Sequence, residues 1–374
     1  MSSNENKNKR WGTPPWEIDF HPIPRAVPDA TDFSIIGGGF TGLATAAWLR
    51  HFAPERSVAV FEAESLGSGS SGRSGGMALE ESSVGDLPGL GDVLGGFAEA
   101  LRVFQIDCDF TLSGVWEISR KKALPDSPIR WADSGELRAA KEVPGGSVDA
   151  GKLLSGLGRA AERLGVRIYE NAPVSNPKFG DSLRLDAGGK SVRATGGLFA
   201  TNAQSFELSG LAQVAESKFT TAVATEPLND AQIDALGLSS RKPFYTTDFP
   251  YLWGRLLSSG GVVFGGGLLD LDNWRELDAV DIDGGEAAAF ITRLERRVRG
   301  LVPGMSEVQF MHRWGGPMGV GPGWGPVFMR HPQSSRALVL GAYSGQGVTL
   351  SVHLGRWAAE ALLGRRELPA WKMD

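Results

Sequence analysis

A short apolar strand that runs into a glycine-rich turn constrains this chain more than any other feature. Residues 33–42 read FSIIGGGFTG, which places Gly37, Gly39 and Gly42 at the spacing of a dinucleotide-binding turn. In such a turn the first glycine makes the tight bend and the second lets the backbone approach a pyrophosphate. The third lets the following helix pack closely. The segment therefore predicts a buried strand and a helix start that holds phosphate.

The residues that follow complete a β-α-β unit. Residues 41–52 carry apolar side chains at helical spacing, and the apolar residues 58–61 form a second short strand that ends before Glu62. An acid at this place accepts a hydrogen bond from an adenosine ribose hydroxyl. No arginine stands beside it to bind a 2′-phosphate, which argues against NADP.

Composition narrows the class of protein. A chain of 374 residues is longer than those that usually fold around a single hydrophobic core, so we expect two domains. A net charge of −5 gives no sign of the excess of basic residues that is typical of nucleic-acid-binding proteins. The single cysteine, Cys108, excludes an internal disulfide and a cysteine-rich metal site, and no metal is expected. No apolar run reaches the roughly 18 to 20 residues that span a bilayer, and the N-terminus lacks a signal peptide. We expect a cytoplasmic protein.

Two segments have an irregular composition. Residues 1–31 are polar and then rich in proline and tryptophan, which predicts an extended arm, disordered over 1–9 and anchored by Trp11 and Trp16. Residues 66–77, LGSGSSGRSGGM, contain too many small residues for a packed element. This stretch is either a flexible surface loop or a loop that wraps a flat ligand, with Arg73 near a negative charge.

Further elements extend the expected nucleotide-binding sheet. The pattern predicts a helix, strands and a hairpin in the middle of the chain, over 149–164, 166–169, 172–174, 182–185 and 190–194. A buried strand follows over 197–202, and near the C-terminus a strand, a turn and a helix occupy 337–340, 341–347 and 348–363. The last turn aims a second helix start at the ligand.

In this order, the pieces resemble the D-amino acid oxidase superfamily, the FAD enzymes that include glycine, sarcosine and gamma-glutamylputrescine oxidases. The resemblance covers nearly the whole chain. Its carriers are IIGGGFTGLATAAWLR with Glu62, GSSGRSGG (69–76), IDCDFTLSGVWEIS (106–119), VDAGKLL (148–154), LFATNA (198–203) and GAYSGQGVTLSVHLGRWAAEALLG (341–364).

The resemblance implies an α/β plus antiparallel β fold. A Rossmann-like FAD-binding domain of the GR2 type would carry a second, antiparallel-sheet substrate domain. The FAD-binding domain would comprise 32–103, 147–214 and 304–374, and the substrate domain 104–146 and 215–303. Alternation in 219–225 and the segment 250–267 fit antiparallel strands.

The resemblance also implies where the non-covalently bound FAD would lie. The expected binding residues are Gly37, Gly39, Phe40, Thr41, Gly42, Glu62, Ala63, Ser71, Gly72, Arg73, Ser74, Gly75, Gly76, Val174, Thr201, Asn202, Gly345, Gln346, Gly347, Val348 and Thr349. The last helix start would face the flavin edge at which negative charge develops on reduction.

The substrate would lie between the flavin and the second sheet. Candidate pocket residues are Tyr251, Trp253, Arg255, His312, Trp314, Met318 and Gln346, although core packing is the more common role for any one aromatic residue. Hydride transfer from a deprotonated amine needs no dedicated acid or base in this family, so no catalytic residue is named. Glu80 and Glu81 could receive a cationic amine, or could simply be solvated.

Three features depart from the sarcosine-oxidase pattern. Val263 stands where that enzyme has the lysine that promotes reaction with oxygen, which leaves open an oxidase or a dehydrogenase. Ala78 and Thr349 stand at its Arg and Lys carboxylate clamp, so either Arg255 or another arginine replaces the clamp, or the substrate has no carboxylate next to its nitrogen. The C-terminal third lacks a cysteine for covalent flavin attachment.

The resemblance implies an FAD-dependent amine or amino-acid oxidoreductase that uses oxygen or another electron acceptor, whereas composition and spacing alone indicate only a nucleotide cofactor. A small-molecule amine is the expected substrate, and a homo-oligomer is possible. Two alternatives stay open: an FAD-dependent dehydrogenase of a hydroxy acid or polyol, and a non-catalytic nucleotide-binding subunit of a heteromeric dehydrogenase.

Overall fold

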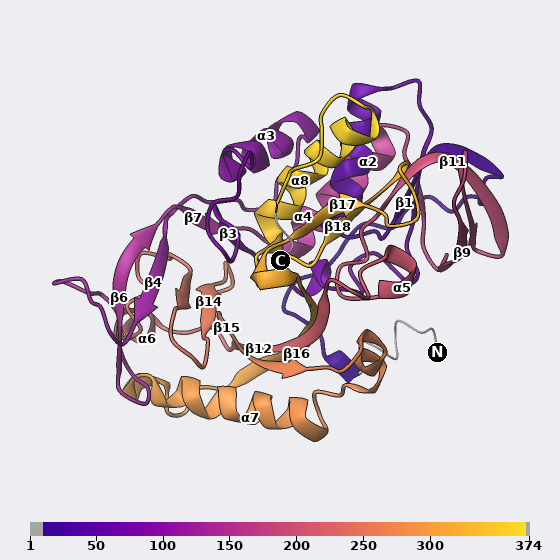
Figure 1. The fold of residues 1–374 in the computed structure, drawn as a ribbon. Helices are drawn as coiled ribbons and strands as arrows, with labels where there is room; N and C mark the ends of the chain where they lie inside the picture. Colours follow the sequence, from indigo (N-terminus) through magenta and orange to yellow (C-terminus); the bar gives the residue numbers. More distant parts are fainter. Residues whose placement is uncertain (1–9, 372–374) are drawn as a thin grey trace.

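The computed structural model describes residues 10–371, whose strands gather into two eight-stranded sheets and one two-stranded sheet (Figure 1). The first sheet has the order β17-β18-β11-β1-β2-β8, with β10 and β9 continuing from β11. Its central strands β18, β11, β1, β2 and β8 are parallel. The strands of this sheet are β1 (Ala30–Ile36), β2 (Val58–Phe61), β8 (Arg167–Tyr169), β9 (Val174–Lys178), β10 (Leu183–Ala187), β11 (Lys190–Phe199), β17 (Val327–Arg330) and β18 (Ala337–Gly341).

The predicted β-α-β unit is confirmed, since β1 pairs in parallel with β2 across the helix α2 (Phe40–Phe52). One expectation was wrong in detail. The hairpin strand at 190–194 and the buried strand that follows it are a single strand, β11. The reason is that β1 pairs with both halves, from Arg193 to Phe199, and so holds them in one line.

Helices α2, α4 (Ala150–Arg163) and α8 (Gly347–Leu362) cover one face of this sheet (Figure 1). Helix α3 (Val93–Phe104) packs on α8 instead of on the sheet. Helix α2 packs against both α4 and α8, and Gly355 allows the close approach of α8, because a Cβ there would lie 2.9 Å from that of Ala44. The opposite face carries the short helix α5 (Phe206–Ser209), which contacts β9.

The second sheet has the order β16-β12-β15-β14-β13-β4-β6-β5 and is antiparallel except for the pair β13–β4. Its strands are β4 (Val115–Ser119), β5 (Arg130–Ala132), β6 (Glu136–Val143), β12 (Glu216–Thr225), β13 (Phe244–Thr246), β14 (Trp253–Leu256), β15 (Val262–Asp270) and β16 (Phe310–Val320). Helix α7 (Gly285–Gly300) covers its outer face and packs on β12 and β15. The remaining elements are β3 (Met77–Leu79) paired with β7 (Gly145–Ser147), α6 (Asp230–Ala235), η1 (Ser71–Arg73), η2 (Trp274–Ala279), η3 (Pro303–Met305) and η4 (Pro322–Trp324).

The chain crosses repeatedly between the two sheets. Strand β16 pairs with β12 in the second sheet, although it falls within 304–374, the stretch expected in the FAD-binding domain. The division into domains stays a prediction.

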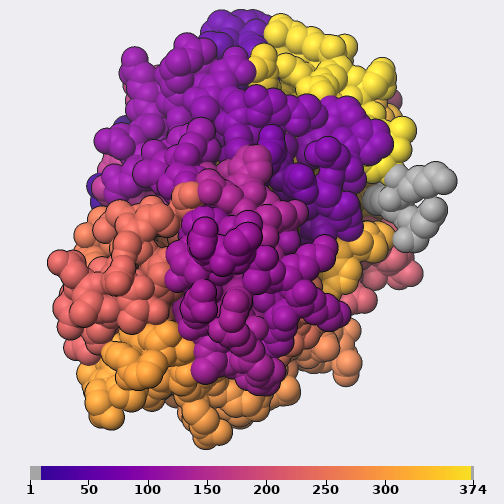
Figure 2. Space-filling view, turned by 90° about the vertical axis from the view of Figure 1, so that its left-hand side faces the viewer, coloured from indigo at the N-terminus to yellow at the C-terminus, as the bar shows by residue number. Residues whose placement is uncertain are grey.

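In the space-filling view the yellow C-terminal segment lies at the top and the orange segment around α7 at the bottom, with the purple segment between them (Figure 2).

The N-terminal arm is anchored in the interior by a few buried side chains. Trp11 is fully buried in the core under α7, and Trp16 is buried in the core around α2, α4 and α8. The arm thus inserts its two tryptophans into different cores. Residues 1–9, expected to be disordered, lie outside the described residues. Within 10–371, no helix has the length and apolar character needed to cross a membrane.

Candidate functional site

The glycine turn after β1 lies against the end of β11. Gly37 has φ +108°, which favours glycine, and its N–H donates to the Phe61 carbonyl at 2.9 Å. A Cβ on Gly37 would lie 2.6 Å from the Ala200 oxygen, and one on Gly42 would lie 1.9 Å from the Gly37 oxygen. These close approaches hold the start of α2 at the edge of a cavity.

Glu62 is fixed at that cavity by backbone donors. The N–H of Gly38 donates to its Oε2 at 2.9 Å, and the N–H of Glu64 donates to its Oε1 at 3.1 Å. Burial raises the pKa of the Glu62 carboxyl, an effect that these two hydrogen bonds oppose. Each carboxylate oxygen retains a lone pair for a ligand hydroxyl.

A hydrogen-bond chain joins the glycine-serine loop to the other walls of the cavity. The Ser71 hydroxyl accepts from the Phe40 N–H at 3.0 Å, at the start of α2. Asn202 donates to the Ser70 hydroxyl at 2.8 Å and accepts from the Ala342 N–H at 2.9 Å. The loop expected to wrap a ligand is therefore an ordered wall, tied to β11 and to the turn before α8.

The start of α8 meets the same cavity. Gly345, Gly347 and Val348 line it, and the Tyr343 hydroxyl lies 2.7 Å from the Thr41 hydroxyl of α2 in a buried hydrogen bond. Burial raises the pKa of Tyr343, so its hydroxyl stays protonated. Two helix starts, with their unpaired N–H groups and positive dipole ends, thus border one cavity.

The inner face of the second sheet roofs the cavity with tryptophans. The Trp253 ring is wedged between loop and sheet, since a Cβ on Gly75 would lie 2.1 Å from it and one on Gly265 would lie 2.0 Å from it. Trp314 donates from Nε1 to the Arg73 carbonyl at 3.1 Å. The glycines thus make room for an aromatic layer directly above the loop.

The cavity has a volume of about 400 Å³, within the ordinary range for small-molecule sites. Most of the predicted cofactor residues line it: Gly37, Gly39, Phe40, Thr41, Glu62, Ala63, Ser71, Arg73, Ser74, Gly75, Val174, Thr201, Asn202, Gly345, Gly347 and Val348. The structure therefore brings together segments that are more than 300 residues apart in the sequence.

Five predicted cofactor residues do not line the cavity: Gly42, Gly72, Gly76, Gln346 and Thr349. The three glycines serve close packing instead; a Cβ on Gly72 would lie 2.3 Å from the Gly67 oxygen. Thr349 is buried, and its hydroxyl donates a hydrogen bond to the Leu79 carbonyl at 2.5 Å. This bond connects α8 to β3.

Of the predicted pocket residues, Trp253, Trp314 and Met318 line the cavity, and Tyr251, Arg255 and His312 do not. Tyr251 is 40% exposed and lies before β14 begins. His312 shares a sheet face with Trp314, but its Nδ1 lies 3.3 Å from the Thr13 carbonyl of the arm. The arm thus covers this histidine.

The cavity also includes residues that the sequence did not indicate. Tyr343 lies in a predicted turn, but nothing in the local pattern showed that its side chain faces Thr41. Trp274, Leu277 and Asp278 reach the cavity from η2, a segment without a motif. Their contribution depends on long-range packing, which a local pattern does not record.

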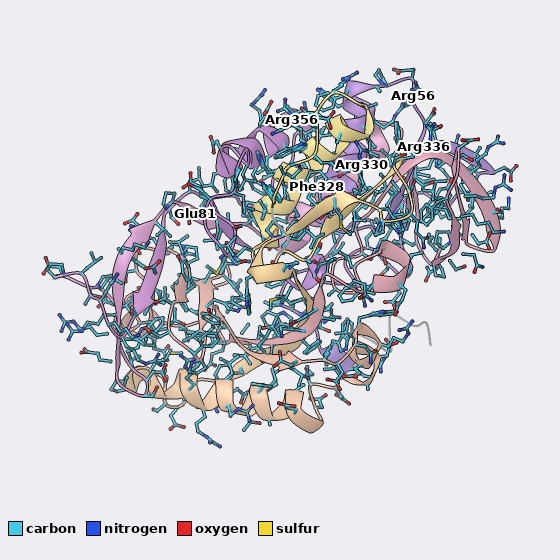
Figure 3. All side chains as sticks on the ribbon, viewed as in Figure 1. Arg56, Glu81, Phe328, Arg330, Arg336 and Arg356 are labelled. Carbon is cyan, nitrogen blue, oxygen red and sulfur yellow. The ribbon has the colours of Figure 1, made fainter. Side chains whose placement is uncertain are left out.

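Three acidic or thiol groups singled out in the sequence stand apart from the cavity. Glu81 is exposed beside β3, and Glu80 is half-buried (Figure 3). Neither lines the cavity. Cys108 is buried, and burial raises the pKa of its thiol to about 12.

The residues present fit a dinucleotide with a polar heterocycle. The Thr201 hydroxyl lines the cavity and is buried without a hydrogen-bond partner among the described residues, so it has capacity for a ligand. Two helix starts offer N–H donors to phosphate and to a ring edge, and Glu62 offers an acceptor. FAD carries groups for each of these.

The positions that depart from the sarcosine-oxidase pattern carry no charge. Val263 is fully buried on β15, and Ala78 is fully buried on β3. Among the described residues that line the cavity, Arg73 is the single cation, and its guanidinium donates to the carbonyls of Gly12 and Gly315 at 2.8 and 3.2 Å.

Comparison with known proteins agrees with this geometry. The model of one protein family, described as DAO, FAD dependent oxidoreductase, matches residues 32–361. A probable oxidoreductase, OrdL, of Haemophilus influenzae is 24% identical, over 93% of this chain and 86% of that protein. The gamma-glutamylputrescine oxidoreductase of Escherichia coli is 25% identical, over 90% of this chain and 84% of that protein.

Solved structures share the fold. Glycine oxidase from Geobacillus kaustophilus superposes with a TM-score of 0.69 at 20% identity, covering 92% of this chain and 97% of that one. L-proline dehydrogenase from P. horikoshii superposes with a TM-score of 0.71 at 16% identity, covering 92% and 96%. The predicted fold, an FAD-binding sheet with a second antiparallel sheet, is confirmed.

Proposed function

The chain belongs to the DAO family of FAD-dependent oxidoreductases, and from this premise we propose that it oxidises the C–N bond of an amine or amino acid. The observation that carries the proposal is the cavity itself. Two helix starts border it on one side, and the Trp253 and Trp314 rings of the second sheet close it on the other.

We assign the cofactor to the residues that line the cavity. The start of α2 with Gly37 and Gly39 would hold the pyrophosphate, and Glu62 would accept from the ribose. Ser74 and Gly75 would lie along the ring system, with the start of α8 at its polar edge. We assign non-covalent attachment, because the chain's one cysteine is buried outside the cavity and no histidine is among the described residues that line it.

Bound FAD would supply the redox chemistry by accepting a hydride from the substrate. The chain's own residues stabilise the developing charge and exclude water. The positive end of α8 stabilises the negative charge that hydride transfer leaves at the adjoining ring edge, without reorganisation. The Trp253 and Trp314 rings exclude water, which favours an uncharged amine with a free nitrogen lone pair.

The charges of the cavity favour an amine that lacks a carboxylate next to its nitrogen. Arg73 is the single cation among the described lining residues, and backbone carbonyls already occupy its guanidinium. A carboxylate at the ring face would therefore meet apolar walls at a high desolvation cost. The relative named gamma-glutamylputrescine oxidoreductase is consistent with an amine of this kind.

Val263 bears on the choice of electron acceptor. A valine at this place provides no cation to stabilise developing superoxide, which favours a dehydrogenase with another acceptor over an oxidase. Peroxide release during turnover separates the two. A stoichiometric release of peroxide would contradict the dehydrogenase.

The test of the whole proposal is an anaerobic absorption spectrum of the purified, FAD-loaded protein with pools of secondary amines, polyamines, amino acids and hydroxy acids. We expect an amine pool to bleach the oxidised flavin band. Bleaching by hydroxy acids alone would overturn the assignment to C–N oxidation, and bleaching by no pool would favour a non-catalytic subunit.

A further inference from the structure

Arg255 is a buried arginine that makes no ion pair among the described residues, and its Cζ lies 5.8 Å from the centroid of the Trp16 ring. Its side chain projects from β14, is 6% exposed, and donates from Nε to the Gly75 carbonyl at 2.6 Å. Its Nη2 is buried and has no hydrogen-bond partner among the described residues. Within the same part of the chain, no carboxylate lies within 4.0 Å of the guanidinium to form an ion pair. A buried, unpaired charge is costly, so it calls for a compensating charge nearby.

Its position relates this charge to the cavity. Gly75 lines the cavity, and a Cβ on its neighbour Gly76 would lie 3.2 Å from the Arg255 Nη2. The guanidinium therefore lies one backbone thickness behind the cavity wall. In the sheet, Arg255 pairs directly with Val263, so their side chains share the inner face. Figure 1 shows β14 and β15 beneath β3.

Arg73, the other buried arginine of the site, differs in its surroundings. Its guanidinium donates to several carbonyls, which spread its charge over the backbone of the arm and of β16. Burial lowers the pKa of Arg255 to about 10, and the distant Asp149 and Asp109 carboxylates oppose this effect. Arg255 thus stays protonated at neutral pH and keeps a charge directed at the cavity wall.

Three donors bind backbone carbonyls of the loop, Arg255 and Trp314 from the second sheet and Trp16 from the N-terminal arm. Arg255 binds the Gly75 carbonyl, Trp314 binds the Arg73 carbonyl at 3.1 Å, and Trp16 binds the Gly72 carbonyl at 2.8 Å. Because the C=O and N–H of a trans peptide point in opposite directions, carbonyls drawn toward the sheet turn the following N–H groups the other way. Of the three donors, Arg255 alone is charged.

We propose that Arg255 is a positioning residue that holds a fixed positive charge behind the flavin-facing loop and thereby favours the reduced form of the bound cofactor. Acceptance of a hydride brings two electrons and one proton, so the ring system gains one negative charge. The guanidinium supplies the counter-charge in place of a lysine at Val263, but from behind the loop and out of contact with substrate. This inference rests on the FAD site proposed above.

The experiment measures the midpoint potential and the dissociation constant of FAD in wild type, Arg255→Gln and Arg255→Lys. Gln keeps a donor for Gly75 and loses the charge, and Lys keeps the charge. For Arg255→Gln we expect the equilibrium to shift about tenfold or more toward oxidised FAD, which is about 30 mV for a two-electron couple. Arg255→Lys at about pH 6, where a buried lysine is protonated, should stay near wild type.

Arg297→Gln is the matched control, because Arg297 is a nearly buried arginine of α7 whose charge is neutralised by Asp133 at 2.6 Å. It should lower stability and leave the potential unchanged. Each of three results would overturn the proposal. The first is an unchanged midpoint potential in Arg255→Gln, and the second is an equal shift in Arg297→Gln. The third is that Arg255→Lys and Arg255→Gln have the same midpoint potential at about pH 6.

If Arg255→Gln does not retain FAD, the lysine variant decides alone. Burial lowers the pKa of the lysine ammonium, so the lysine loses its charge as the pH rises from about 7 to 10. The midpoint potential of FAD in Arg255→Lys should therefore fall below that of wild type over this range. Parallel profiles over that range would overturn the proposal. Failure of the wild-type protein to bind FAD would instead contradict the cofactor site itself.

Discussion

Gly39→Val tests the assignment of the pyrophosphate to the start of α2. Gly39 precedes the helix with φ −82° and ψ −173°, a conformation open to any residue, so valine fits the backbone. Its Cβ would lie 2.7 Å from the Ser71 hydroxyl, which must turn away and give up its bond to the Phe40 N–H. The loss of this bond and of a good N-cap residue costs about 1–3 kcal/mol of folding free energy.

The effect on the cofactor should be much larger. The valine side chain would occupy the place of the pyrophosphate, which loses its hydrogen bonds to the first-turn N–H groups. Each such bond to a charged group contributes about 1.5–3 kcal/mol, so the loss of two weakens FAD binding by about 10²- to 10⁴-fold. The unfolding midpoint of the apoprotein should fall by only a few degrees.

Equilibrium dialysis against FAD and thermal unfolding of the apoprotein measure the two effects separately. Gly180→Val is the control, because a Cβ there meets nothing within 4 Å and the residue lies outside the cavity. A folded Gly39→Val protein that binds FAD as tightly as wild type would refute the placement of the pyrophosphate.

Three further predictions concern the cavity walls and the pH dependence of stability. Tyr343→Phe leaves the buried Thr41 hydroxyl without its partner and should lower the free energy of unfolding in urea by about 1–3 kcal/mol; an unchanged midpoint would show that the bond is not formed. Trp253→Ala should remove about 3 kcal/mol and admit water, with a fall in turnover of the best amine; full activity would contradict its role as a roof. Burial lowers the pKa of His331 and of His353 below the 6.5 of the unfolded chain, so unfolded protein takes up protons first as the pH falls through about 6.5. Stability should therefore decline between about pH 6.5 and 5, and less so after replacement of both histidines by glutamine; equal declines in urea titrations would contradict this cause.

The sequence predicted the parts of the site that rest on local chemistry. The turn at Gly37, the acid at Glu62 and the strand-turn-helix that ends in α8 each follow from glycine geometry and periodicity within a few dozen residues. They lie where the pattern predicted, because parallel strands place their carboxyl ends at one edge of the sheet.

The positions of the candidate residues that do not line the cavity depend on contacts between distant segments. Tyr251 and Trp253 are two residues apart and looked equivalent, but β14 begins only at Trp253, so Tyr251 falls outside the sheet. The face of His312 is covered by Thr13 of an arm whose packing left no periodic signal. Likewise, the sequence placed Arg255 among the pocket candidates, whereas its hydrogen bond to Gly75 and its pairing with Val263 place its guanidinium behind the loop.

The most direct test of the account is a crystal structure of the protein loaded with FAD. The account predicts the pyrophosphate at the Gly37–Gly39 turn and the ring system between Gly75, Trp253 and the start of α8. Density for FAD at any other place, or a cavity that stays empty at saturating FAD, would contradict it.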